Sequence, residues 1–171
     1  MRNGIANLLA RGVVALGNSA SKLQSLQLRL TAGEVKDNME HLEPYGFTAS
    51  PLEGAEALAG FFGGDRSHGV VIVVSDRRFR LQGLKPGEVA IYTDEGDRIY
   101  LKRGRVIDIE TVTLNVKASD SVNFDTPLIS TTGRIESAGD QVAAGISQIN
   151  HPHEGVQPGN GQSGPPIGGG A

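Results

Sequence analysis

The sequence predicts an all-β fold: a small barrel, then a long β-ribbon completed by other copies of the chain, with a short N-terminal helix in front. Three features indicate this. The continuous Val/Ile run "GVVIVVSD" at 69–76 is typical of a strand buried on both faces. The "DEGD" at 94–97 marks a hairpin turn between two strand-like segments. Residues 112–128 alternate between apolar and polar side chains over 17 positions without a glycine.

Composition and charge narrow the classes of function. The 171 residues include 16 basic and 19 acidic ones, a net charge of −3. Nucleic-acid-binding proteins usually concentrate positive charge, so no nucleic-acid partner is expected. The absence of cysteine excludes disulfides and Cys-ligated zinc. No apolar run approaches the roughly 20 residues that cross a bilayer.

Residues 1–21 predict an amphipathic helix that docks a partner. Arg11 interrupts the apolar stretch and Arg2 is the only charge before it, which disfavours a cleaved signal peptide. Apolar residues recur at helical spacing and form one stripe: Ile5, Leu8, Leu9, Val13 and Leu16.

Residues 22–96 predict the barrel domain, because short strand-like segments and turns follow one another there. Such a pattern favours a small Greek-key barrel, for which the five-stranded OB-fold is the candidate. Within it, "PLEGAEALAGFF" at 51–62 predicts a short helix that ends at Gly63 and Gly64.

Residues 97–140 contain the ribbon. One interpretation is a long edge strand of an ordinary sheet. The favoured one is an intertwined oligomer, because a lone ribbon would leave its apolar face and both edges uncovered. Three chains form the simplest such prism, with the even positions inside. Seven of the nine even positions from 112 to 128 are apolar: Val112, Leu114, Val116, Ala118, Val122, Phe124 and Leu128.

Residues 141–171 contain two of the four histidines, His151 and His153, before a Gly/Pro-rich end that alone would suggest disorder. In an extended chain these two side chains point to the same side, and Pro152 favours that conformation. A bare H-x-H is usually ordinary surface sequence. Three chains would provide six imidazoles, a set that suits octahedral iron(II) or nickel and not tetrahedral zinc.

Several segments, in this order, resemble the central spike proteins of Mu-like contractile-tailed bacteriophages, the baseplate assembly protein V group. They are "MEHLEPYGFT", "GGDRSHGVVIVVSDRRFRL", "EVAIYTDEGDRIYLKRGR", the alternating ribbon and "HPH…G…SGPP". The resemblance covers nearly the whole chain, and the "GGDRSHG" and "YTDEGD" blocks are its most specific parts.

The resemblance implies an OB-fold, a trimeric β-helix at 97–140 and a needle tip at 141–171. It implies one iron per trimer, held at the apex by His151 and His153 of each chain. Related spikes also hold buried calcium or halide ions, and Asp120 and Asp125 are the first residues to inspect for such a site. The β-helical section is short, and Glu154 directly follows the second ligand, which are departures from the family pattern.

The function implied by the resemblance is mechanical. A homotrimer in the virion tail baseplate would sit on a hub protein, plug the end of the tail tube and pierce the host outer membrane when the tail contracts. A spike of a related injection device, such as a tailocin or a type VI-like secretion system, would have the same sequence features.

An enzyme is the first alternative, since Asp65, Ser67 and His68 supply the residue types of a catalytic triad. Their adjacency favours a turn, because triad members normally converge from distant segments. Glycines 60, 63 and 64 match no phosphate-binding loop. No catalytic residues are therefore predicted, and His41 and His68 are expected to be ordinary surface or turn residues.

An OB-type module that binds oligonucleotides or sugars is the second alternative. It would need a basic groove rich in aromatic side chains. Arg77, Arg78 and Arg80 form a tight basic cluster, but aromatic residues are scarce. The spike interpretation is therefore preferred.

Overall fold

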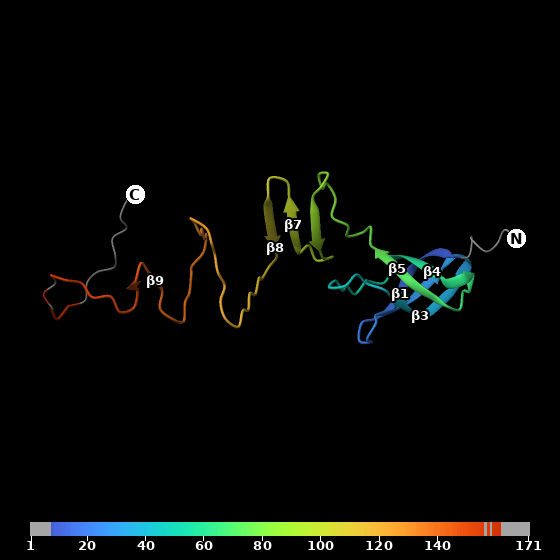
Figure 1. Ribbon diagram of the computed structural model, residues 1–171, viewed down its shortest axis with the longest axis horizontal. Helices are drawn as coiled ribbons and strands as arrows, with labels where there is room; N and C mark the ends of the chain where they lie inside the picture. The colour runs from blue at the N-terminus through green and yellow to red at the C-terminus, as the bar shows by residue number, and fades with distance from the viewer. Residues whose placement is uncertain (1–7, 156, 158, 162–171) are drawn as a thin grey trace. The chain divides into compact units, whose positions relative to one another are not determined.

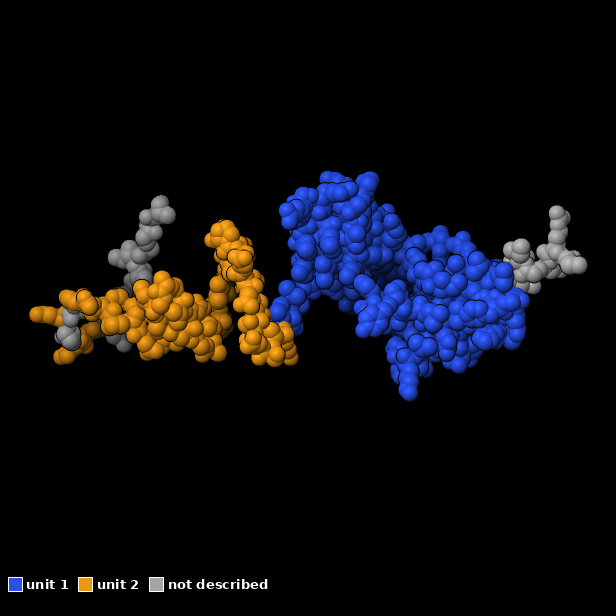
Figure 2. Space-filling model, viewed as in Figure 1, with its two compact units in different colours: residues 1–116 blue, residues 117–171 orange. Residues whose placement is uncertain are grey.

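The computed structural model describes residues 8–155, 157 and 159–161. The chain divides into two compact units, residues 1–116 and residues 117–171 (Figure 2). Among the described residues the only helical segments are two short 3-10 turns, η1 (Thr31–Gly33) and η2 (Phe62–Gly64). None of the helical segments in this part of the chain has the length and hydropathy to cross a membrane. The all-β prediction is confirmed.

The first five strands close into a barrel in the order β1-β2-β3-β5-β4, with β4 pairing back onto β1 (Figure 1). Strands β3 and β5 run parallel, and the other neighbours are antiparallel. The predicted five-stranded barrel is therefore present. Its strands are β1 (Leu9–Asn18), β2 (Ser25–Leu30), β3 (Val35–His41), β4 (Glu56–Phe61) and β5 (Gly69–Ser75).

The barrel interior is filled by alternate residues of its strands. In β2 and β4 every second side chain is buried, as expected where one face of a strand meets a core. The core is aliphatic apart from Phe61 and Met39, and it is closed by small residues from β4. Its members are Val14, Leu26, Leu28, Leu30, Met39, Ala55, Ala57, Ala59, Phe61 and Val71.

The predicted N-terminal helix is wrong over 9–18, where β1 runs through the barrel. Its apolar residues recur at a spacing that fits a helix, but the β-branched pair Val13 and Val14 favours a strand. Gly12 lies directly against β2, where a Cβ atom would come within 2.6 Å of the Arg29 carbonyl oxygen. Residues 1–7, which include Ile5 of the predicted stripe, lie outside the described residues.

The helix predicted at 51–62 is also wrong, because residues 56–61 form β4. Alanine favours helices in isolation. Here Ala57 and Ala59 alternate with outward-facing residues and point into the barrel, so packing overrides the local preference. The strand is followed by η2, in which Gly63 adopts a positive φ of 62°.

A separate three-stranded antiparallel sheet follows the barrel, in the order β6 (Val89–Tyr92), β7 (Arg98–Lys102) and β8 (Val106–Glu110). The barrel strands thus end at Ser75, whereas the sequence had suggested one domain to residue 96. The predicted hairpin at 94–97 is confirmed. The Thr93 N–H donates to the Asp97 carbonyl at 3.0 Å, and Gly96 takes a φ of 97°.

One face of this sheet is wholly aliphatic. Strand register places Val89, Leu101 and Ile107 in one cross-strand row. Ile91, Ile99 and Ile109 form the second row. We call these six residues the aliphatic face. Each of their side chains is 40–63% exposed in the single chain, which is unusual for six neighbouring aliphatic residues.

The opposite face of the sheet is polar and internally paired. Arg98 bonds to Glu110, and Lys102 bonds to Asp108, in both cases across β7 and β8. The Tyr100 hydroxyl donates to the Glu88 carboxylate. The sheet therefore has one side suited to water and one side that is not.

Residues 111–141 form no strand within the single chain. The alternating residues predicted to face inward stay exposed, Val112, Leu114 and Phe124 among them. A ribbon whose partners are other chains has no ladder hydrogen bonds in one copy, so the trimeric β-helix remains a prediction.

In the second unit a bend at 119–120 is followed, seven residues later, by a regular series with a six-residue spacing. The bends of this series fall at 126–127, 132–133 and 138–139, and a hairpin turn follows at 144–145. Side-chain hydroxyl groups stabilise the three bends of this series. Those of Thr126, Thr131 and Ser137 each donate to the carbonyl two residues later, at 3.0, 3.3 and 2.8 Å. The segment therefore has a regular six-residue repeat.

Glu34 makes the barrel sensitive to acid. The Arg66 Nε and Lys36 Nζ atoms each lie 3.1 Å from its carboxylate, and the Arg66 hydrogen bond is the main cause that lowers its pKa from 4.5 to about 2. A carboxyl whose pKa falls on folding stabilises the fold above its unfolded pKa and loses that effect on protonation. This stabilisation should be full above pH 4.5 and disappear as the pH falls towards 2.

We therefore expect Glu34→Gln to lower the thermal midpoint of the barrel near neutral pH, with a difference from wild type that vanishes near pH 2. Glu40→Gln, on the exposed side of the strand β3 that follows Glu34, is the control and should follow the wild-type curve. Thermal unfolding followed by circular dichroism across this pH range provides the measurement. Parallel curves for Glu34→Gln and wild type would contradict the assigned role.

Candidate metal centre

A β-hairpin precedes the two histidines of the C-terminal segment. Strands β9 (Val142–Ala143) and β10 (Ile146–Ser147) pair in antiparallel register. The two residues between them, Ala144 and Gly145, have φ angles of 50° and 82°. Positive φ at both positions is the mark of a type I′ turn, whose twist matches that of the flanking strands.

Backbone hydrogen bonds fold residues 148–150 back onto this hairpin. The Gln148 N–H donates to the Gln141 carbonyl at 2.9 Å, and the Ile149 N–H donates to Asp140 Oδ1 at 3.2 Å. The Asn150 N–H donates to the Ser147 hydroxyl at 2.8 Å. The chain that leads into the histidines is therefore held at three successive residues.

Asp140 is the acidic group of this cluster. A hydrogen bond from the Ser147 side chain is the largest cause that lowers the pKa of its carboxyl below 3.8, and the Ile149 N–H acts in the same direction. The sequence prediction missed both Asp140 and Ser147. Gly145 between the apolar Val142 and Ile146 was the available signal, since a glycine in that place is typical of a two-residue hairpin turn.

The structure brings the rings of His151 and His153 together. Their centroids lie 4.8 Å apart in an edge-to-face arrangement with an interplanar angle of 73°. Both residues are exposed. The Nδ1 atom of His151 lies 2.7 Å from the carbonyl oxygen of Ser147.

The donor set fits a metal only if several chains share it. Two imidazoles are too few for a stable protein site. Within the described part of a single chain, no group of three or more His, Cys, Asp or Glu side chains could hold a metal ion. The two rings are exposed and adjacent, so no residue that the structure describes covers them. Imidazole ligands suit iron, nickel, copper and zinc.

The residues considered for a calcium or halide site do not form one in a single chain. Asp120 and Asp125 are both exposed, and neither belongs to a converging group of ligands among the residues that the structure describes. Such ions remain a prediction.

The residues of the enzyme alternative form a turn. The backbone N–H and the hydroxyl of Ser67 both donate to Asp65 Oδ1, at 2.9 and 2.7 Å. The His68 ring packs edge-on against Phe62, with centroids 5.4 Å apart. The Ser67 hydroxyl thus serves the Asp65 side chain, and the predicted turn is confirmed.

The expectation that His41 is an ordinary surface or turn residue is wrong. It is the last residue of β3 and is only 9% exposed. Its Nδ1 atom lies 3.0 Å from Gln24 Oε1, and the Gln24 Nε2 group donates to the Ala49 carbonyl at 2.9 Å. His41 and Gln24 thus form a satisfied polar pair that anchors the loop between β3 and β4.

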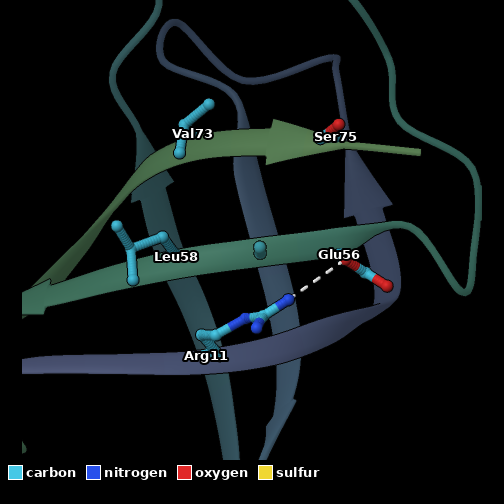
Figure 3. Close-up of a pocket in the computed structure, with 6 residues that line it drawn as sticks. Arg11, Glu56, Leu58, Val73 and Ser75 are labelled. Carbon is cyan, nitrogen blue, oxygen red and sulfur yellow. Dashed lines mark hydrogen bonds and ion pairs between the residues drawn. The ribbon is translucent and has the colours of Figure 1, made fainter. Parts of the chain in front are cut away.

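The outer surface of β1, β4 and β5 has a shallow depression, lined by Arg11, Glu56, Ala57, Leu58, Val73 and Ser75 (Figure 3). No aromatic residue is among these six. Arg11 donates to the Glu56 carboxylate at 3.3 Å. The lining lacks the aromatic stacking surface that an oligonucleotide-binding groove requires.

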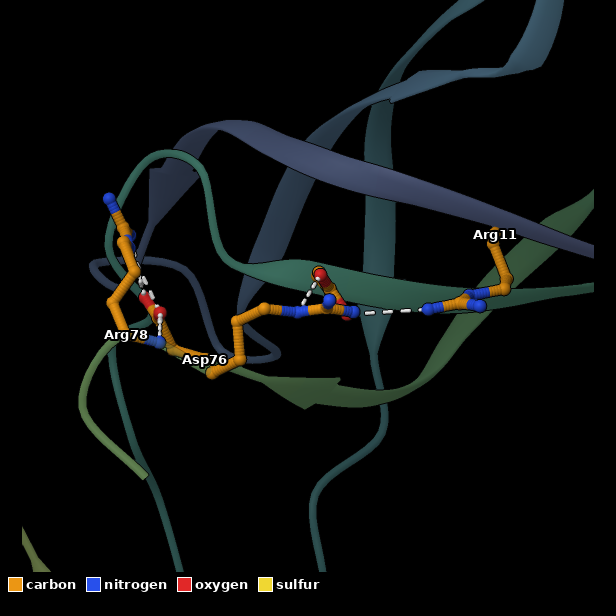
Figure 4. A network of polar contacts seen from close by, with 5 residues as sticks. Arg11, Asp76 and Arg78 are labelled. Carbon is orange, nitrogen blue, oxygen red and sulfur yellow. Dashed lines mark hydrogen bonds and ion pairs between the residues drawn. The ribbon is translucent and has the colours of Figure 1, made fainter. Parts of the chain in front are cut away.

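The basic cluster is largely occupied by ion pairs. Arg77 Nε lies 2.6 Å from the Glu56 carboxylate. Arg78 binds Asp76 (Figure 4). It also donates to the Glu53 carbonyl at 2.9 Å. These contacts raise the pKa values of both arginines, mainly through hydrogen bonds from their guanidinium groups to Glu56 and Asp76 respectively.

Known protein families match both ends of this architecture. Residues 11–78, which include nearly all of the barrel, match the family described as Bacteriophage Mu Gp45, N-terminal. Residues 145–166 match the GpV Apex motif. The second match begins at the glycine of the hairpin turn and includes both histidines.

Two relatives are similar over most of this chain. The "Baseplate puncturing device gp45" of Escherichia phage Mu is 45% identical over 130 residues, 75% of this chain and 66% of the relative, which is just under two thirds of its length. The "Mu-like prophage FluMu protein gp45" of Haemophilus influenzae is 37% identical over 166 residues, 90% of each chain. The chain therefore belongs to the gp45 family of Mu-like phage baseplate proteins, the central spike proteins of the tail.

Proposed function

We propose that three copies of this chain form the central spike of a phage tail baseplate, which punctures the host outer membrane when the tail contracts and plugs the end of the tail tube. The role is mechanical and includes no catalytic step. The observation that carries the proposal is the Apex match at 145–166, because it falls on the hairpin and the histidine pair that follow the barrel and the three-stranded sheet in sequence. The puncturing role named for the phage Mu relative supports it.

The aliphatic face of the β6–β8 sheet supports a trimer. Its six side chains are half exposed in one chain, and burying the exposed half of a Val, Ile or Leu side chain stabilises by about 1 kcal/mol. Three sheets around a threefold axis would direct all three aliphatic faces inward and leave the ion-paired faces in water. Closed rotational symmetry of this kind is the usual arrangement of homo-oligomers.

The same axis would continue through the residues that follow β8. Val112, Leu114 and Phe124 are exposed in one chain and would pack against their counterparts in three. Backbone groups that lack partners in one copy would bond to neighbouring chains, so that unfolding the shaft requires separating all three strands together. That construction suits a part that transmits force along its length.

The metal that fits this proposal is iron. Two histidines from each of three chains give six imidazole nitrogens, and His151 and His153 would hold it. When bound, the metal would supply a structural clamp across three chain ends. We propose no redox or hydrolytic chemistry for it.

A hub protein of the baseplate is the proposed partner of the other end of the chain. The docking element cannot be a helix at residues 9–18, since these form β1. We therefore propose that the hub protein contacts the outer surface of the barrel or residues outside the described range.

Mass measurement joined to elemental analysis tests the proposal. The purified protein should have a mass of about three times 17.9 kDa and contain one iron per three chains. The double variant His151→Ala, His153→Ala should lose the iron. His41→Ala together with His68→Ala removes the other two histidines and should retain it. A monomer without a transition metal would contradict both the spike assembly and its metal.

A further inference from the structure

The hydrogen bond between His151 and Ser147 defines which ring nitrogen of His151 is free. A backbone carbonyl only accepts hydrogen bonds. The Nδ1 atom, which lies 2.7 Å from the Ser147 oxygen, must therefore carry the hydrogen. In the neutral ring Nε2 is then unprotonated and has the lone pair that a metal requires.

The Ser147 carbonyl is itself held in place from two directions. Ser147 ends β10 and pairs with Val142 of β9. Its hydroxyl accepts the Asn150 N–H at 2.8 Å. Asp140 in turn accepts the Ile149 N–H at 3.2 Å. Both the hairpin and the following turn thus converge on this one residue.

We propose that Ser147 and Asp140 are positioning residues for the metal centre. Ser147 orients the His151 ring and selects its tautomer through its main-chain carbonyl. Asp140 fixes the turn that follows by accepting the Ile149 N–H. The inference rests on the proposed function, because it presumes that His151 binds metal. Metal-bound histidines commonly donate their second ring N–H to such a carbonyl or carboxylate, which fixes the ring and its tautomer.

The arrangement also explains why a hairpin stands directly before the histidines. A two-residue type I′ turn leaves little freedom in the register of β9 and β10. The position of the Ser147 oxygen is therefore set by the hairpin before any metal binds. A ring that is already oriented loses less conformational entropy on ligation than a free one.

Substitution of Ser147 tests this inference in the full-length chain. Ser147→Ala removes the hydroxyl that accepts the Asn150 N–H. We expect it to weaken iron binding by about 10- to 100-fold, as is typical when support of a metal ligand is lost. Ser147→Thr keeps the hydroxyl and should restore binding. Ser137→Ala is the matched control, since its hydroxyl bonds to Gly139 at 2.8 Å, away from the hairpin. The readout is the rate at which iron is lost to a chelator.

A second measurement determines the tautomer of His151 in the absence of metal. In iron-free protein labelled with 15N at histidine, the four imidazoles can be assigned by single replacement of each. In its neutral form, His151 should show a protonated Nδ1 and an unprotonated Nε2. Ser147→Ala should shift it towards the Nε2–H form, and Ser137→Ala should not.

The outcomes separate the two proposals. If the wild-type protein binds no iron, the proposed metal is wrong, while the 15N spectrum still decides the tautomer. If iron binds but Ser147→Ala releases it no faster than Ser137→Ala, the positioning role is wrong and the metal centre stands. A His151 signal with Nε2 protonated in the wild type would overturn the inference in either case.

Discussion

Ile99→Asp is expected to abolish the trimer. Ile99 is the middle residue of one row of the aliphatic face, between Ile91 and Ile109. In the proposed assembly the substitution would place three carboxylates near one axis without partners. Burial of an unpaired charge costs several kcal/mol per ion, more than the aliphatic contacts of that row would supply. Light scattering should report a monomer at micromolar concentration.

Val106→Asp is the matched control for this prediction. Val106 lies on β8 of the same sheet but pairs with Lys102 on the polar face. It is 46% exposed, close to the 40% of Ile99. A carboxylate there stays in water beside a cation, so the trimer should persist. Loss of assembly in both variants would indicate a general folding defect. Persistence in both would show that the aliphatic face is not the contact surface.

Leu28→Ala should destabilise the barrel strongly. Leu28 is completely buried in the core, and truncation of a buried leucine to alanine costs about 2–5 kcal/mol. Hydrogen exchange of the β2 and β4 amides, followed by mass spectrometry, measures the barrel separately from the rest of the chain. Protection of these strands should fall by about one to three orders of magnitude.

Leu16→Ala provides the comparison on a neighbouring strand. Leu16 lies in β1 but is 64% exposed, and substitutions at such surface positions usually change stability by less than about 0.5 kcal/mol. Exchange in β2 and β4 should therefore match wild type. Equal losses for the two leucines would mean that the barrel has no core at Leu28.

A continuous β-branched run and a turn motif predicted their elements correctly, whereas the two helix predictions failed. The Val/Ile run became β5. Its expected burial on both faces is wrong, because only Val71 is buried while Ile72 and Val73 are exposed. The turn at 94–97 became the β6–β7 hairpin of the separate sheet. The two helices were wrong because helical spacing and alanine content are local signals. The close approach of Gly12 to β2 and the inward position of Ala57 and Ala59 depend on strands distant in sequence.

The arrangement of the two histidines was predicted only in part, because one of its contacts depends on the fold of the preceding hairpin. An H-x-H motif in extended chain implies two rings on one side, and the structure places them 4.8 Å apart. The contact of His151 with the Ser147 carbonyl could not be read from the sequence, because it depends on the positive φ angles of Ala144 and Gly145 that bring the hairpin back. Every residue has a main-chain carbonyl, so the amino-acid sequence does not show which carbonyl accepts a hydrogen bond from a histidine.

The regular bends of the second unit bear on how such a protein can change in length. Bends at 126–127, 132–133 and 138–139, followed by the turn at 144–145, advance by the same number of residues each time. Duplication or deletion of one whole six-residue segment between bends would leave the orientation of all later side chains unchanged. In the proposed trimer, a gain of any other size would rotate the histidines away from their counterparts. The proposed shaft could therefore change in length only by whole six-residue segments.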